Sequence, residues 1–200
     1  MSRHIGYLFI APAFIILFFT SIYPVAFSFY FSFFDWNWGN QENFIGLDNY
    51  LFLLTDPEFW TVIYNTFVFA SVSCFLEVTI GIILAIFVDR IVFCSTIIRT
   101  ILILPLMVSG IIVSMISKIM FNNLFGVIPY GLKQIDIRSS FFGSTEAAMP
   151  TLIGVDVWWQ TSFVFIIILA ALQGISNDTV EAAKIDGASE WDITRFIRLP

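Results

Sequence analysis

The sequence has little charge for its length. Asp, Glu, Lys and Arg make up only 12% of its 200 residues, and 58% are hydrophobic, whereas about 25% charged residues is usual in a soluble domain. A soluble fold could not bury so much apolar side chain, so the composition excludes an ordinary globular domain and predicts a membrane protein. The net charge of −6 offers no basic surface for nucleic acid.

Residues that carry chemistry are also scarce. The only histidine is His4, and the only cysteines are Cys74 and Cys94. On one continuous helix these cysteines would lie ~30 Å apart, too far for a disulfide, which predicts packing roles. The chain contains no G-x-x-x-x-G-K-[ST] phosphate loop and no metal-ligand spacing, so we expect neither ATP hydrolysis nor another enzymatic activity from it.

Long uncharged runs predict an all-α protein with several membrane spans. Residues 5–34 and 157–177 carry no charge, and 59–88 carry only Glu77. A span needs roughly 20 apolar residues. Gly81 and Ala85 have the spacing of small residues that allow close helix packing. The predicted spans are 5–34, 59–88, 97–121 and 150–175.

The placement of Lys and Arg predicts the orientation of these spans. Residues 35–58 contain five acids and neither Lys nor Arg, which indicates an external loop. Arg90 and Arg99 flank the next loop, which is therefore predicted to be cytoplasmic. The amino terminus is then also cytoplasmic, and four crossings return the chain to the cytoplasm at residue 176.

Residues 176–200, called here the elbow, form the longest charged passage of the chain. Apolar residues at helical spacing (Ile193, Phe196 and Ile197) predict one apolar stripe. An ordinary amphipathic pair of surface helices would have the same pattern.

Helix-capping residues predict how the elbow folds. Asp178 is expected to cap a first helix, with Glu181 completing a capping box. Gly187 is expected to stop that helix in a left-handed conformation. Ser189 is expected to cap a second helix, with Asp192 in the reciprocal position, and Pro200 to end it.

The amino-acid sequence of the elbow resembles a known motif. Glu181-Ala182-Ala183, then Gly187, and later Ile197 and Leu199-Pro200 resemble the EAA loop in the membrane subunits of binding-protein-dependent ABC importers. Asp186 and Ala188 give E-A-A-x-x-D-G-A, which is similar to the carbohydrate-importer branch. The candidate coupling residues are therefore Glu181, Ala182, Ala183, Asp186, Gly187, Ala188, Phe196, Ile197, Leu199 and Pro200.

The resemblance implies a fold, partners and a location. The fold would be the multi-span helical bundle of a type I ABC importer transmembrane domain, with the elbow docked on a separate ATPase subunit. Expected partners are a second permease subunit, two ATPase subunits, an extracytoplasmic solute-binding protein and the lipid bilayer. This chain would bind no cofactor, because ATP would be bound by the ATPase subunits. The location would be the inner membrane of a bacterial-type cell. About two further helices would follow Pro200, so we expect the chain to be truncated after the elbow.

Other stretches resemble the same family, with three departures. The runs around Pro24, Pro105 and W-W-Q-T-S-F are similar to its first, third and fourth spans. Ser117 stands where a tryptophan is expected, Pro129 where an asparagine is expected, and Ser176 where a proline is expected. These departures predict a different substrate surface and a different entry angle of the elbow.

Polar residues in the spans are candidates for a substrate path: Asp156, Trp158, Trp159, Gln160, Glu77 and Asn65. Indole rings and polar side chains suit sugars, but tryptophans also form interfacial belts that face lipid. An acid within a span is costly and suggests function, yet Glu77 fits a packing role better. An ion-coupled secondary transporter that uses Glu77 is the alternative function.

Overall fold

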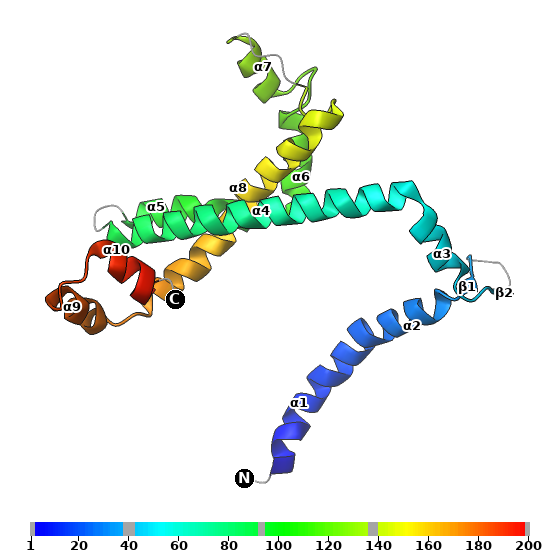
Figure 1. Cartoon of the computed structure of the whole chain (residues 1–200), viewed down its shortest axis with the longest axis horizontal. Coiled ribbons are helices and arrows are strands. Elements are labelled where there is room, and N and C mark those ends of the chain that lie inside the picture. The colour runs from blue at the N-terminus through cyan, green and yellow to red at the C-terminus, as the bar shows by residue number, and fades with distance from the viewer. Residues whose placement is uncertain (1–2, 38–42, 92–94, 136–139, 199–200) are drawn as a thin grey trace. The chain divides into compact units, whose positions relative to one another are not determined.

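A computed structural model describes residues 3–37, 43–91, 95–135 and 140–198. Within these ranges the regular secondary structure is helical apart from one pair of two-residue strands, which confirms the all-α prediction. Figure 1 labels the elements in chain order. The first part contains α1 (Arg3–Leu17), the π-helix η1 (Phe18–Ile22), α2 (Tyr23–Phe31), β1 (Phe34–Asp35), β2 (Asn43–Phe44) and α3 (Asp48–Thr55). The second part contains α4 (Pro57–Arg90), α5 (Ser95–Ile103), the 3-10 helix η2 (Leu104–Met107), α6 (Gly110–Met120), α7 (Val127–Lys133), α8 (Thr145–Gln173), α9 (Asn177–Ile185), α10 (Glu190–Ile193) and the π-helix η3 (Thr194–Arg198).

The chain forms two compact units, Met1–Asn65 and Thr66–Pro200. In the first unit, the π turn η1 lies directly before Pro24, which occupies the first turn of α2. Proline has no N–H for the preceding turn, and a wider turn accommodates the missing hydrogen bond. After α2, Phe34 pairs with Phe44 in antiparallel register, and the Asn49 side-chain amide donates to the Ser32 and Phe34 carbonyls.

Three continuous helices in the described residues are long and apolar enough to cross a membrane, namely Phe9–Phe31, Pro57–Arg90 and Thr145–Gln173. The predicted third span, 97–121, is not one straight helix. Ser95–Met107 and Gly110–Met120 meet at an angle of 92°. Pro105 lies in the 3-10 turn, and Val108 and Ser109 have extended backbone torsions that interrupt the helix.

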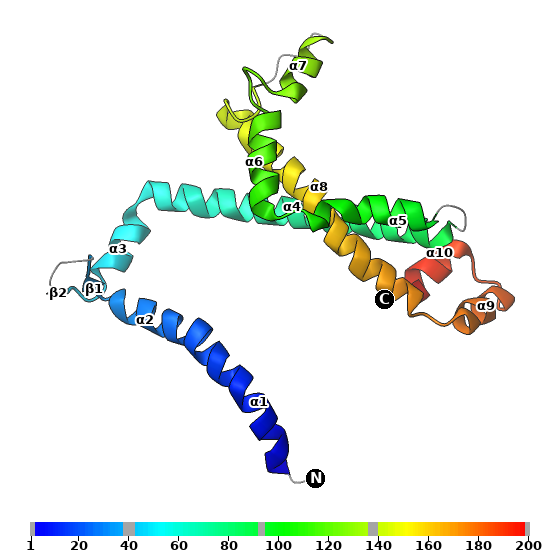
Figure 2. The ribbon, with the colours of Figure 1, turned by 180° about the vertical axis from the view of Figure 1, so that it is seen from behind.

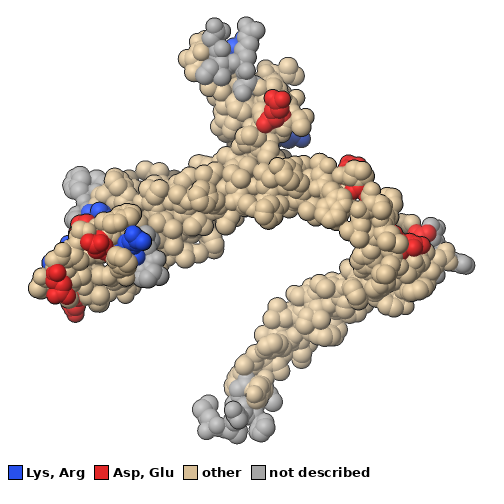
Figure 3. Space-filling model, in the orientation of Figure 1, with Lys and Arg blue, Asp and Glu red and all other residues tan. Residues whose placement is uncertain are grey.

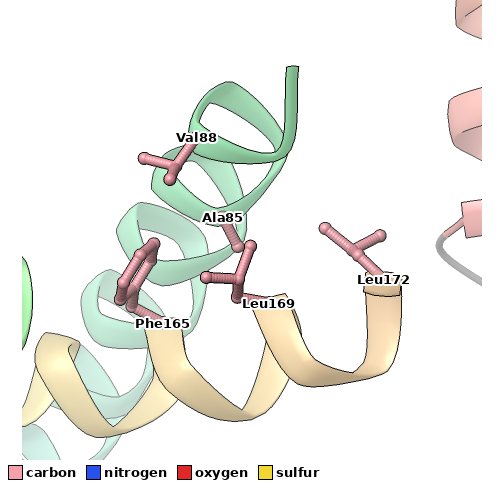
Figure 4. Packing of buried hydrophobic residues seen from close by; sticks show 5 residues of the cluster. All are labelled: Ala85, Val88, Phe165, Leu169 and Leu172. Atoms are coloured by element: carbon pink, nitrogen blue, oxygen red, sulfur yellow. The ribbon is translucent and has the colours of Figure 1, made fainter. Parts of the chain in front are cut away.

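The second unit is centred on the packing of α4 against α8. In both views α8 crosses α4, and α5 runs beside the carboxyl-terminal part of α4 (Figures 1 and 2). Buried side chains from both helices meet there in one cluster, shown in Figure 4: Ala85, Val88, Phe165, Leu169 and Leu172. A Cβ on Gly81 would lie 2.6 Å from Cγ1 of Val164, so only glycine fits this approach. The predicted close packing at Gly81 and Ala85 is confirmed.

Most large apolar side chains of the spans lie outside this core. Phe67 and Phe75 on α4, for example, are 71% and 70% exposed. Such a surface is unfavourable in water but suits lipid or other membrane helices. Figure 3 shows long uncharged surfaces on the helices, with charges of both signs gathered on the elbow.

Candidate functional site

The elbow follows α8 directly, and its first helix is capped by Ser176. The Ser176 Oγ accepts a hydrogen bond from the Thr179 amide at 3.3 Å, and α9 begins at Asn177. The prediction that Asp178 is the N-cap is therefore wrong, because the helix starts two residues earlier than expected. Asp178 lies in the first turn, where a carboxylate favours the positive end of the helix dipole. The serine that departs from the family pattern thus supplies the cap.

Gly187 ends this helix as predicted. Its φ is +83°, and the Ala188 amide donates to the Ala183 carbonyl at 2.9 Å, as in a Schellman motif. A Cβ at Gly187 would meet no atom within 4 Å. The requirement for glycine therefore comes from the backbone conformation, not from lack of space.

Ser189 and Asp192 form the predicted capping box of α10. The Ser189 side chain accepts from the Asp192 amide, and the Asp192 carboxylate accepts from the Ser189 amide. The hydrogen bond from the Ser189 hydroxyl, and then that from its amide, lower the pKa of Asp192. The start of the second helix is thereby fixed next to the Gly187 turn.

Apolar residues of the elbow do not form the predicted single stripe. Ile193 is fully buried, whereas Phe196 is 66% exposed and Ile197 is half-buried. Residues 194–198 form a π-helix, which has more residues per turn and rotates these positions away from the α-helical pattern. Ile185 and Trp191, which were not among the candidates, are 86% and 68% exposed.

The elbow therefore presents large apolar side chains within a charged hairpin. The signal for this was in the sequence, because Ile185 and Trp191 interrupt a charged passage. Of the motif residues, Ala183 and Ala188 are half-buried and four are exposed: Glu181, Ala182, Asp186 and Gly187. Leu199 and Pro200 lie outside the described residues, so the predicted stop at Pro200 lies outside them too.

Polar contacts tie the elbow to the ends of the membrane helices. Arg90, the last residue of α4, donates from Nη2 to the Thr194 hydroxyl at 2.9 Å. With its amide oxygen facing α5, Gln173 accepts from both terminal nitrogens of Arg99 at 2.9 and 3.0 Å. The elbow is thus in contact with α4, and the end of α8 that leads into the elbow is in contact with α5.

Within the spans, the structure brings Glu77 and Asp156 together. The carboxyl group of Glu77 on α4 lies beside that of Asp156 on α8. Each group is half-buried, and Oε1 of Glu77 is enclosed without a further partner. These acids are far apart in the sequence, and the crossing of α4 and α8 brings them together.

The two tryptophans of α8 have different roles. The Trp159 indole donates to the Val108 carbonyl at 3.1 Å, and its ring would lie 2.9 Å from a Cβ on Gly110. It therefore fastens α8 to the break between η2 and α6. Trp158 is 57% exposed and lines two cavities on either side of it. Of the two candidate tryptophans, Trp158 lines these cavities and Trp159 does not.

These cavities have volumes of about 750 Å³ and 380 Å³. The larger lies between α6, α7 and α8 and is mostly apolar, with Ser117 and Thr151 among its few polar lining residues. Ser117 occupies the position where a tryptophan was expected, and the smaller side chain leaves space in this cavity. The remaining path candidates do not line these cavities: Gln160 is half-buried, and Asn65 is exposed ~18 Å along α4 from Glu77. In the parts of the chain that the structure describes, no three His, Cys, Asp or Glu residues gather as metal ligands.

Comparisons with known proteins agree with this architecture. Residues 77–200 match the family described as binding-protein-dependent transport system inner membrane component. The chain is 34% identical over 194 residues to a probable starch degradation products transport system permease protein, AmyD, from Thermoanaerobacterium thermosulfurigenes. That alignment covers 97% of this chain and 66% of AmyD. The trehalose/maltose transport system permease protein MalF of Thermococcus litoralis is 32% identical, with 98% and 67% covered.

A solved structure has the same fold. A bacterial ABC transporter involved in import of the acidic polysaccharide alginate contains a chain that matches with a TM-score of 0.83 and 26% identity. The match covers 98% of this chain and 67% of that chain. The chain spans 58% of a further relative, the probable ABC transporter permease protein y4oQ of Sinorhizobium fredii, so it corresponds to only part of the length of the relatives it matches. With the family match covering α8, the elbow and most of the second unit, the chain belongs to the binding-protein-dependent transport system inner membrane components.

Proposed function

We propose that this chain is a membrane subunit of an ATP-driven importer whose substrate is a carbohydrate. The observation that carries the proposal is the elbow: a capped, charged hairpin that follows a membrane-length helix and exposes Ile185, Trp191 and Phe196. Large apolar side chains that are exposed on a charged segment are typical of a protein-binding surface. The EAA-like residues at the same place support an ATPase subunit as the partner.

The carbohydrate assignment rests on the relatives. AmyD and MalF have names that specify starch degradation products and trehalose/maltose, and the alginate transporter imports a polysaccharide. A related structure is in complex with an alginate pentasaccharide-bound periplasmic protein. We therefore expect an extracytoplasmic solute-binding protein to deliver substrate to this chain and a second permease subunit.

The orientation in the inner membrane follows from the placement of Lys and Arg. The amino terminus and the elbow are on the cytoplasmic side, and residues 35–58, which carry neither Lys nor Arg, are outside. Two ATPase subunits bind ATP, and this chain binds no cofactor. Closure of the ATPase subunits shifts the elbow as a rigid lever and changes the membrane helices between outward and inward access.

Reconstitution of the complete transporter in proteoliposomes tests the proposal. Candidate ATPase, permease and binding-protein partners are co-purified with this chain, and uptake of labelled oligosaccharides is measured. We expect uptake that requires ATP and the binding protein and persists when ionophores collapse ion gradients. Uptake that needs an ion gradient and persists without the ATPase subunits would instead support ion coupling through Glu77, which the relatives do not favour.

A further inference from the structure

The elbow is attached to the membrane helices at two places. One attachment is covalent, because residues 174–176 connect it to α8. The other is the contact between Arg90 at the end of α4 and Thr194, whose hydroxyl also donates to the Glu190 carbonyl at 2.7 Å. Ile193 and Thr194, the residues at this contact, are 0% and 5% exposed. The second attachment is therefore a packed interface.

One carboxylate joins the segments that meet there. Glu190 lies 3.0 Å from Lys184 on α9, 3.6 Å from Arg90 on α4 and 3.8 Å from Arg198 on η3. Together these four residues are called the Glu190 cluster. Every ion pair found among the described residues includes this carboxylate. The hydrogen bond and charge of Lys184, followed by the charges of Arg90 and Arg198, lower the pKa of Glu190.

The position of Glu190 makes its charge structurally decisive. Without it, cations from α4, α9 and η3 would lose the carboxylate that they share. An isolated exposed ion pair contributes little, but several charges that share one partner act as a network. Neighbouring Asp192 does not replace Glu190, because its carboxylate is engaged by Ser189 in the capping box.

We infer that Glu190 is a positioning residue that fastens the elbow to α4, so that movement of the elbow is transmitted to α4 through Arg90 as well as to α8 along the backbone. A hairpin held only at residues 174–176 could pivot when its partner pushes on it. A second fixed point prevents this rotation and makes α4, α8 and the elbow move together. This inference rests on the proposed function, because it concerns how the ATPase subunits drive the permease.

The first test changes the charge at the centre of the cluster. The complete transporter is reconstituted with Glu190→Lys, with Glu190→Gln and with Asp178→Asn as the matched control. Asp178 is an exposed acid of the same elbow and belongs to none of these ion pairs. Substrate uptake, ATP hydrolysis and co-purification of the ATPase subunits are measured for each variant.

We expect Glu190→Lys to lower the ratio of uptake to ATP hydrolysis about fivefold or more, the lower end of coupling between distant sites. Glu190→Gln has a smaller effect, and Asp178→Asn retains the original ratio. ATPase subunits still co-purify with each variant. An unchanged ratio in Glu190→Lys overturns the inference, as does a loss caused only by failure to bind the ATPase subunits.

The second test replaces the polar contact with a covalent one. Arg90→Cys and Thr194→Cys are combined in a chain whose native Cys74 and Cys94 are replaced by serine, and the pair is bridged with a short thiol-reactive linker. The unbridged protein is expected to hydrolyse ATP with reduced uptake, and the bridge is expected to restore uptake. Full uptake without the bridge, or no recovery with it, contradicts a fixed connection. Absence of ATP-driven uptake in the cysteine-free parent would instead refute the proposed function.

Discussion

The close approach of α4 and α8 predicts a measurable penalty for adding one methyl group at Gly81. A Cβ there would lie 2.6 Å from Cγ1 and 2.9 Å from Cβ of Val164. A rotamer change can move Cγ1, but Cβ moves only with the backbone of α8. Since carbon atoms pack best at about 3.5–4.0 Å, the helices must separate by about 0.6–1.1 Å at this point.

The expected cost of Gly81→Ala is about 1–3 kcal/mol of overpacking. Alanine also favours the helix by about 0.8–1.0 kcal/mol over glycine, which offsets part of this cost. Gly154→Ala is the matched control, because Gly154 lies inside α8 and a Cβ there meets nothing within 4 Å. It has the helix-propensity gain without the clash.

Thermal unfolding of the detergent-solubilised chain separates the two effects. The fraction of monodisperse protein is measured after heating, for the original protein and for both variants. Gly81→Ala is expected to be less stable than Gly154→Ala by the full overpacking cost, about 1–3 kcal/mol. Equal stability of the two variants would show that α4 and α8 do not pack through Gly81.

Three further perturbations have defined outcomes. Gly187→Val forces a β-branched residue to positive φ, so it should abolish ATP-coupled uptake without preventing membrane insertion. The control Gly131→Val should leave uptake intact, because Gly131 has no positive φ and a Cβ there meets nothing within 4 Å. Trp159→Phe leaves the Val108 carbonyl without its donor and should destabilise the chain by about 1–3 kcal/mol in the same unfolding assay. Equal stability of Trp159→Phe and the unaltered protein would show that this hydrogen bond does not hold α8 to the break before α6. Because Lys184 lowers the pKa of Glu190, ion-pair stabilisation of the elbow is complete above the unfolded-state pKa of about 4.3 and is lost as pH falls through the lower native value. Amide hydrogen exchange in the elbow, corrected for intrinsic rates, should therefore increase more on acidification in the original protein than in Glu190→Gln, in which only the Asp192 capping box is still lost.

Capping and turn patterns in the sequence predict the features that depend only on residues close together in the chain. The Gly187 turn and the Ser189–Asp192 capping box depend on side chains within a few residues of one another, and the structure has both. The cap of α9 was misplaced because Ser176 and Asp178 are both good capping residues. The sequence alone does not decide which of these two nearby residues is the N-cap.

Features that depend on distant residues were not predictable. The contact of Glu77 with Asp156 and the hydrogen bond of Trp159 to Val108 require the crossing of helices far apart in sequence. The apolar run 97–121 reads as one span by composition, although its extended residues divide it. Hydrophobicity predicts that a segment avoids water, but it does not predict where the backbone bends.

The central claim is that the elbow lies on the cytoplasmic side of the membrane and is covered there by the ATPase subunits. Ile185→Cys, at a highly exposed position, is introduced into a chain with Cys74 and Cys94 replaced by serine. A membrane-impermeant maleimide is applied to right-side-out and inside-out vesicles, with and without the ATPase subunits. We predict labelling only in inside-out vesicles, and protection when the ATPase subunits are bound. Labelling of right-side-out vesicles, or no protection by the ATPase subunits, would contradict the account.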